Sequence, residues 1–207
     1  MKQFGVWITV VVTVLTGATA PAAHAGESPW SLVRERDGIA VYTRPVEGSG
    51  IREFKGSALV AASAESIHTL LRDADGFKDW FPNTSESRLL SREGNVSYRY
   101  TVIDTPWPVS DRDNIFRNET EIDPQSGRIT IRITAAPDDY PEQPQRVRVR
   151  RALGLWLLEP IRADATRVTF KMHLEPGGGV PQWLLNTQVV ETPFDVLTNL
   201  RAAVARR

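Results

Sequence analysis

Residues 167–204 read RVTFKMHLEPGGGVPQWLLNTQVVETPFDVLTNLRAAV, and this C-terminal stretch decides the fold. Apolar side chains occupy every second position from Val168 to Leu174, which is the period of a β-strand with one face in water. A segment rich in Pro and Gly follows at 176–181, and apolar residues then recur at helical spacing from Gln182 to about Val204. A half-buried strand followed by a long helix predicts an α+β domain whose last helix covers a sheet.

Two features of this stretch bear on the shape and motion of the helix. Pro193 lies within the helical pattern, where its ring removes a backbone hydrogen bond, so we expect a kink there. The three consecutive glycines at 177–179 leave the backbone many conformations, whereas the prolines on either side restrict theirs. This pattern favours a hinge before the helix, and a simple connector is the alternative interpretation.

The rest of the chain predicts more strands and one short helix. Ser63 can cap a helix in which apolar residues recur from Ala64 to Leu71. Alternating or β-branched runs bounded by turns predict three strands before that helix and about six after it. The clearest of these runs lie at 30–36, 39–46, 51–60, 96–102, 113–117, 128–133, 146–150 and 167–174.

The number of strands has a consequence for the shape of the sheet. Twisted strands curl a sheet of this size, so we expect a curved antiparallel β-sheet wrapped around the long C-terminal α-helix. The helix then covers either a filled core or, where the side chains fall short, an internal hydrophobic cavity. The residues alone leave both arrangements open.

The first 25 residues have the pattern of a cleaved secretory signal peptide. Lys2 precedes an apolar run at 4–15, and the small residues after it end in Ala23-His24-Ala25. The apolar run is shorter than the roughly 20 residues that span a bilayer, which disfavours a membrane anchor. We therefore expect residues 26–207 to form one exported domain, periplasmic if the source is a Gram-negative bacterium.

The composition excludes several classes of function. The chain has 25 Lys and Arg against 25 Asp and Glu, so it lacks the basic excess of a nucleic-acid-binding protein. It has no Cys, which excludes disulfides, thiolate zinc sites and Cys nucleophiles. Beyond the signal segment only His68 and His173 remain, so neither a metal cluster nor a catalytic triad is indicated. We expect no catalytic residue, no metal, no cofactor and no nucleic-acid partner.

A family resemblance lies in residues 98–113, YRYTVIDTPWPVSDRD. The strand with tyrosines, the Pro-Trp-Pro turn and the Arg-Asp pair that opens the next strand resemble the central signature of START lipid-transfer domains. The Asp79-Trp80 pair and the segment 181–186 match other parts of that family, so the resemblance covers residues 28–203. It implies a helix-grip fold with a hydrophobic tunnel for one lipid-like molecule, such as a sterol, hopanoid, fatty acid or phospholipid.

Candidate ligand contacts lie first in this signature. Tyr98 and Tyr100 share a strand face, which in a gripped-helix fold is both core and cavity wall. Arg112 and Asp113 point to opposite faces, so at most one of them enters the cavity. A buried guanidinium needs a carboxylate, and we favour a structural ion pair over the alternative that Arg112 or Arg117 meets the polar head of a ligand.

Further candidates lie in the turn and on the last helix. Trp107, between two prolines, packs over the mouth of the tunnel or touches a membrane interface. The last helix is expected to close the cavity with residues near one of its faces, although ordinary packing is the alternative for any single one of them. These residues are Trp183, Leu184, Thr187 and Val190.

The sequence leaves three functions open. The first is a monomeric, non-enzymatic carrier that shields a lipid in an aqueous compartment and makes transient contact with membranes. The second is an enzyme similar to the polyketide cyclases and aromatases of related helix-grip folds, although no acid and base constellation is visible. The third is an interaction module of the cell envelope with a filled core and no ligand.

Overall fold

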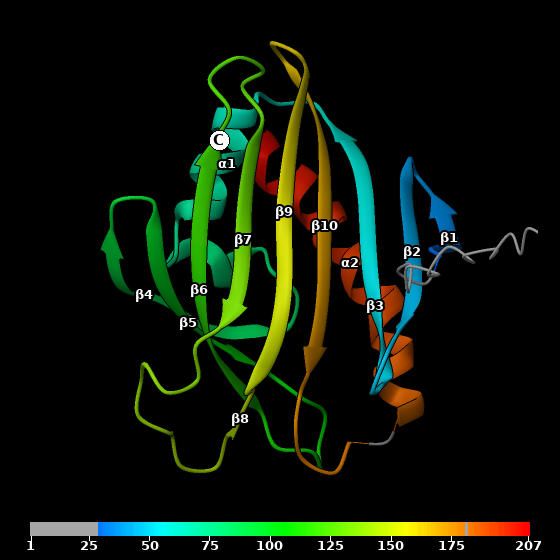
Figure 1. Ribbon diagram of the computed structural model, residues 1–207, viewed down its shortest axis with the longest axis vertical. Coiled ribbons are helices and arrows are strands. Elements are labelled where there is room, and N and C mark those ends of the chain that lie inside the picture. Colours follow the sequence, from blue (N-terminus) through cyan, green and yellow to red (C-terminus); the bar gives the residue numbers. More distant parts are fainter. Residues whose placement is uncertain (1–28, 181) are drawn as a thin grey trace, which may run out of the picture.

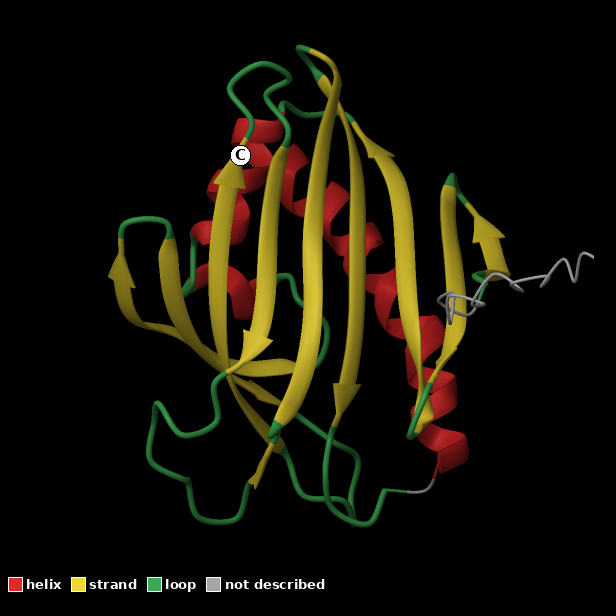
Figure 2. Cartoon of the chain, viewed as in Figure 1, coloured by secondary structure: helices red, strands yellow, loops and turns green. Residues whose placement is uncertain are grey.

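The architecture is one curved sheet around one long helix (Figures 1 and 2). We describe residues 29–180 and 182–207 of a computed structural model, so the predicted signal peptide lies outside the described residues. In chain order the elements are β1 (Ser31–Arg36), β2 (Ile39–Val46), β3 (Ser49–Val60), α1 (Ala64–Arg72), η1 (Gly76–Asp79), β4 (Thr84–Glu93), β5 (Val96–Ile103), β6 (Arg112–Ile122), β7 (Ile129–Ala135), β8 (Val147–Arg148), β9 (Arg151–Arg162), β10 (Ala165–Glu175) and α2 (Gln182–Ala205).

The strand order is β1-β2-β3-β10-β9-β7-β6-β5-β4, with antiparallel neighbours throughout. Figure 1 shows the sheet bending around α2, whose C-terminal end lies beside α1. The predicted α+β helix-grip arrangement, with a curved antiparallel sheet and a C-terminal helix, is confirmed. None of the helices in the described ranges is long and apolar enough to cross a membrane.

The prediction of a strand at 146–150 is wrong in extent. Within this segment, β8 holds just Val147 and Arg148, which pair in parallel with β6. The long strand starts at Arg151 and forms β9 at the centre of the sheet. The alternating arginines at 146–150 thus belong mostly to a loop. Arg148 holds this loop in place because it is buried in an ion pair with Asp113.

The long helix lies against β3 because a glycine leaves room for it. A Cβ atom on Gly56 would come within 2.9 Å of Leu197 Cδ1 and 3.0 Å of Pro193 Cβ. Near the end of the helix, Arg201 donates hydrogen bonds to the carbonyls of Asp37, Gly38 and Leu59. These contacts fix the C-terminal half of α2 to the end of the sheet formed by β1, β2 and β3.

The short helix begins and ends as the sequence indicates. The Ser63 hydroxyl accepts a hydrogen bond from the Ser66 N–H at 3.1 Å, which caps the first turn. The buried face of α1, with Ile67 and Leu71, joins the main core between the sheet and α2. Figure 2 shows α1 and the C-terminal end of α2 at the end of the sheet where the chain terminates, and long loops beside the start of α2 at the opposite end.

Candidate functional site

A cavity of about 570 Å³ lies between the sheet and the N-terminal half of α2. This volume falls within the range of pockets that hold small molecules. The sequence left a filled core and a cavity as alternatives, and the structure has the cavity. Most of its wall is apolar and comes from β3, η1, β7, β9, β10 and α2. The apolar lining includes Phe54, Phe77, Phe81, Ile131, Ile133, Trp156, Phe170, Met172, Leu174, Leu185 and Val189.

One wall of the cavity is polar, and it belongs to β5 and β6. Alternate residues of both strands face inward, so that residues paired across the ladder line the same wall. We call this set the polar wall. Its cross-strand pairs are Ser97 with Asn118, Arg99 with Phe116, Thr101 with Asn114, and Ile103 with Arg112.

Arg99 is the main charge of the polar wall. Its guanidinium lies 4.2 Å from the centre of the Phe77 ring and donates a hydrogen bond to the Leu71 carbonyl at the end of α1. No carboxylate of the described residues lies within ion-pair distance of it, and the charges that act on it are those of Arg92 and Asp73. Asp73 itself pairs with Arg207. Burial lowers the pKa of Arg99 to about 10, and the repulsion of Arg92 adds to this shift. At neutral pH this cation stays charged, and among residues 29–180 and 182–207 it has no carboxylate partner.

Asn114 is the buried amide of the polar wall. The side chain is 2% exposed, and its Nδ2 lies 3.4 Å from the Thr101 hydroxyl. Its Oδ1 is buried and has no hydrogen-bond partner among the described residues. An unsatisfied buried acceptor costs free energy, and such groups are uncommon in folded proteins. A ligand in the cavity could supply the missing donor.

Arg112 stands at the mouth of the cavity. It donates to the Ser110 carbonyl and, at 3.1 Å, to the Gly177 carbonyl. Its Nε is buried without a partner in the described part of the chain, and burial lowers the pKa of its guanidinium. In the described part of the chain no carboxylate forms an ion pair with Arg112, so the favoured interpretation of a structural ion pair does not hold for this residue and applies to Asp113, which pairs with Arg148. Its place on the cavity lining is compatible with the alternative interpretation, contact with a polar head.

The charge of the lining differs from that of the whole chain. Arg52, Arg72, Arg99 and Arg112 contribute to the described wall, and its single acidic residue is Asp104. Arg72 and Asp104 are both exposed, whereas Arg52, Arg99 and Arg112 are at least partly buried. The chain as a whole has equal numbers of basic and acidic side chains. The cavity therefore carries a local excess of positive charge. In the described ranges, no group of three His, Asp or Glu residues could hold a metal ion.

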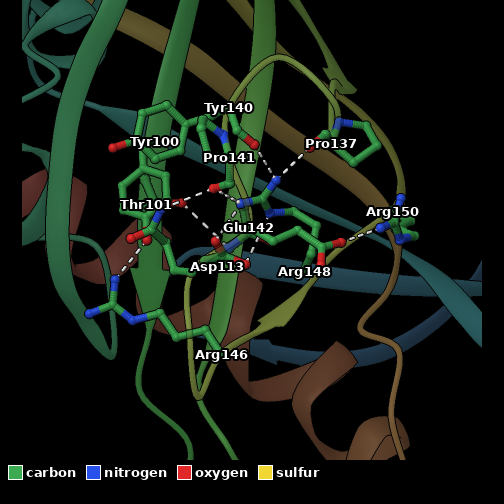
Figure 3. Close-up of polar contacts among 12 residues, drawn as sticks. Tyr100, Thr101, Asp113, Pro137, Tyr140, Pro141, Glu142, Arg146, Arg148 and Arg150 are labelled. Carbon is green, nitrogen blue, oxygen red and sulfur yellow. Dashed lines mark hydrogen bonds and ion pairs between the residues drawn. The ribbon is translucent and has the colours of Figure 1, made fainter.

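Tyr98 and Tyr100 do not lie on the cavity wall, which corrects the expectation for this face. Tyr100 is fully buried on the other side of β5, where it packs against Val102 and Ile115. Its ring centre lies 5.2 Å from that of Tyr140 (Figure 3). The shared face of the tyrosines was predicted correctly, but it packs under the loop that joins β7 to β8.

That loop is held by a buried ion pair. Asp113 accepts two hydrogen bonds from Arg148, at 3.0 and 2.8 Å, and the two side chains are 1% and 3% exposed. Arg148 also donates to the carbonyls of Pro137, Tyr140 and Pro141 (Figure 3). Asp113 is thus the structural member of the Arg-Asp pair, and its partner is Arg148. The other candidate, Arg117, pairs with Glu119 away from the cavity at 2.7 Å.

The structure places the remaining predicted contacts as follows. Trp107 is 92% exposed, in the same loop as Asp104, Thr105 and Pro106, which line the cavity. Thr187 is exposed and Val190 packs against the main core, and neither belongs to the lining. The side chains of Trp183 and Leu184 lie outside the described part of the chain, so their roles stay predictions.

The helix does line the cavity, but through a neighbouring face. Leu185, Gln188, Val189 and Thr192 follow the spacing of one helical face and contribute to the wall. The sequence pattern does not reveal them, because apolar residues stand side by side in α2, as in Leu184-Leu185 and Val189-Val190, and so do not single out one face of the helix. Arg99 and Asn114 were also not predicted, although the alternation of Tyr98 and Tyr100 implies an opposite face of the strand.

Comparison with known proteins agrees with the geometry. A family model described as START domain matches residues 19–207. An uncharacterized protein of Pseudomonas aeruginosa is 34% identical over 197 residues, which cover 95% of this chain and 97% of that protein. The human phosphatidylcholine transfer protein is 26% identical over 163 residues, which cover 76% of this chain and 75% of that protein.

Solved structures of lipid transfer proteins also resemble this chain. A STAR-related lipid transfer protein from Xanthomonas axonopodis superposes with a TM-score of 0.80 at 43% identity, covering 85% of this chain and 98% of that one. The Zhui aromatase/cyclase from a Streptomyces species superposes with a TM-score of 0.52 at 20% identity, covering 76% and 95%. At that identity the cyclase shares the fold alone.

Proposed function

Since the chain belongs to the START domain family, we propose that it binds and carries one lipid-like molecule without chemical change. The observation that supports this most directly is the cavity of about 570 Å³ with an apolar body and one polar wall. Each buried methylene contributes roughly 0.8 kcal/mol, so an acyl chain or a sterol gains a strong drive to enter. A sterol, hopanoid, fatty acid or phospholipid has this amphipathic shape.

The composition of the lining favours a carrier over a cyclase-like enzyme. General acid and base catalysis needs titratable groups within hydrogen-bond reach of the substrate. In the described lining, Asp104 is the single carboxylate and no histidine is present. We therefore assign the site to binding.

Location is a separate part of the proposal. The Lys2, apolar run and Ala23-x-Ala25 pattern supports export with cleavage after Ala25, to the periplasm in a Gram-negative host. There the mature monomer would carry its ligand between membranes. N-terminal sequencing of the protein from its own cells should give Gly26, and an uncleaved Met1 in the membrane fraction would overturn the assignment.

Membrane contact is proposed at the mouth of the cavity. Trp107 is almost fully exposed beside the lining residues Thr105 and Pro106, and tryptophan favours the interface between lipid and water. Trp107→Ala should weaken binding to lipid vesicles while the amount of lipid held per protein stays the same. Leu153→Ala, at an exposed apolar residue of β9, is the matched control. Equal losses in both variants would argue against a specific docking point.

The carrier function itself is tested by native mass spectrometry. Protein purified from its own envelope should contain one co-purifying lipid per chain, and delipidated protein should take up lipid from vesicles. Protein that neither retains nor takes up lipid would instead be an interaction module with an empty cavity.

A further inference from the structure

The polar wall is specialised in a way that the general function does not explain. Its two central polar groups, Arg99 and Asn114, lie diagonally across the β5 and β6 ladder on the same face. Diagonal neighbours in antiparallel strands are roughly 7–8 Å apart, within the span of a lipid head group. Arg112 flanks Asn114 two residues earlier on β6 and also faces the cavity.

We propose, on the basis of the proposed carrier function, that the cavity selects a lipid with an anionic, hydroxyl-bearing head group and discriminates against choline. In this arrangement the anionic oxygen accepts hydrogen bonds from the Arg99 guanidinium. A hydroxyl of the same head group donates to Asn114 Oδ1. Phosphatidylglycerol has both groups.

The first support is the lack of a partner for each group. Arg99 donates to one carbonyl and meets no carboxylate of the described chain within ion-pair distance. A partly buried cation without an ion-pair partner is costly, so an anion bound at this place offsets part of that cost. The Oδ1 atom of Asn114 is an acceptor with no donor among the described residues. One ligand with an anionic oxygen and a hydroxyl satisfies both.

The second support is the charge of the wall as a whole. Four arginines and one aspartate contribute to the described lining of a chain whose formal net charge is zero. Arg72 and Asp104 are exposed, which leaves Arg52, Arg99 and Arg112 as the charges set deeper in the wall. An anionic head group is attracted by this excess of positive charge, which acts through an apolar cavity where screening by salt is weak.

The third support concerns choline, the head group named for the mammalian relatives. A quaternary ammonium is recognised by the faces of aromatic rings. Phe77, the ring beside Arg99, is covered by the Arg99 guanidinium at 4.2 Å and stacked on Phe81 at 4.5 Å. A choline at this wall would meet a cation in place of a free ring face.

The test is a competition between lipids that differ in the head group alone. Delipidated mature protein is mixed with vesicles of equal parts dioleoyl phosphatidylglycerol and dioleoyl phosphatidylcholine, then recovered, and its bound lipid is quantified by mass spectrometry. The single-chain forms of the two lipids are compared in a second run, so that the size of the cavity does not decide the result. We expect phosphatidylglycerol to be enriched about tenfold or more, since hydrogen bonds to charged groups have this strength.

Three variants locate the preference. Arg99→Gln removes the cation, and Asn114→Asp places a nearly isosteric carboxylate beside Arg99. Each variant should reduce the enrichment of phosphatidylglycerol over phosphatidylcholine to near unity, while phosphatidylcholine is still bound. Arg117→Gln removes a charge from the other face of β6, where it pairs with Glu119, and should keep the full preference. Asn114→Asp preserves the test if Arg99→Gln does not fold, because it leaves the bond to the Leu71 carbonyl in place.

Each outcome has one meaning. Binding of both lipids without preference, or a preference that survives both cavity variants, overturns the proposed selectivity and leaves the carrier function standing. A preference lost equally in Arg117→Gln also overturns it, because the cause is then the general surface charge. Failure to bind any of the four lipids also overturns the proposed selectivity, whereas the carrier function is decided separately by whether the protein from its own envelope contains a co-purifying lipid.

Discussion

At the scale of single residues, the buried pair of Asp113 and Arg148 carries more weight than any surface ion pair. Removing Asp113 leaves a guanidinium that is 3% exposed without its carboxylate, although three backbone carbonyls still accept from it. Breaking such pairs costs about 3–5 kcal/mol. We expect Asp113→Ala to lower the free energy of unfolding by that amount in urea denaturation.

Two controls bring out the origin of this effect. Asp113→Ala combined with Arg148→Met should recover part of the loss, since the unpaired buried charge is then removed. Asp138→Ala, which breaks an exposed pair with Arg150, should change stability little. A loss in the double variant equal to or larger than that of Asp113→Ala would mean that the pair is not the cause.

A second residue makes stability depend on pH. His68 is buried in α1, and its pKa is lowered from 6.5, first by burial and then by Arg72 and Arg92, with Glu65 opposing the shift. Below about pH 6.5 the unfolded chain binds a proton that the folded chain resists, so the free energy of unfolding falls as the pH falls toward the folded value. Above pH 6.5 both states are neutral and the contribution is constant.

His68→Gln and His68→Leu test this pH dependence. Both remove the imidazole, so their unfolding free energy should decrease less than that of the parent between pH 7 and pH 5. The slope lost can reach about 1.4 kcal/mol per pH unit, the limit for one proton. Urea titrations at several pH values measure it, and parallel profiles for the parent and both variants would exclude His68 as the source.

At the scale of elements, the sequence predicts where strands and helices lie but not which of their faces meets the cavity. The first three strands and α1 follow from alternation, turns and the Ser63 cap, all of which are local signals. Whether Tyr100 or Thr101 faces the cavity depends on how β5 is placed in the sheet, which no local pattern specifies. The same reason explains why the cavity face of α2 was assigned to Thr187 and Val190 in place of Leu185 and Val189.

The contact between α2 and β3 gives a prediction for Gly56. A Cβ atom there would approach Leu197 and Pro193 to 2.9 and 3.0 Å, closer than packed atoms tolerate. Overpacking of this kind costs roughly 1–3 kcal/mol, so Gly56→Ala should lower the thermal midpoint. Gly179→Ala, which meets no atom within 4 Å, is the control and should leave the midpoint unchanged or slightly raised. Equal midpoints for both variants would mean that the helix shifts without cost.

At the scale of the whole molecule, the two ends of the cavity differ in how they are closed. α1 and the anchored C-terminal half of α2 close one end, where Arg201 holds three carbonyls of the sheet. The other end is bounded by loops, with Pro106 on one side and Pro176 and Val180 on the other. Arg112 links these loops through the carbonyls of Ser110 and Gly177. We expect a ligand to pass the loop end, where the predicted hinge at 177–179 lies.

The glycine conformations decide which variant tests that hinge. Gly177 and Gly178 have φ values of 65° and 66°, so alanine at either position would strain the backbone as well as stiffen it. Gly179 does not adopt the left-handed region, and a Cβ atom there would meet nothing within 4 Å. Gly179→Ala thus restricts the backbone without crowding, and it should raise the barrier for loading and release alike.

We expect Gly179→Ala to slow the release of a bound fluorescent lipid several-fold while its equilibrium affinity changes little, because a stiffer gate affects both directions equally. Arg112→Gln should act in the opposite sense on the release rate, since it removes the hydrogen bond that ties Gly177 to the opposite side of the mouth. Stopped-flow transfer to acceptor vesicles measures both rates. Release as fast as that of the parent in a normally folded Gly179→Ala protein would show that the glycine segment is a connector and that the ligand leaves without its motion.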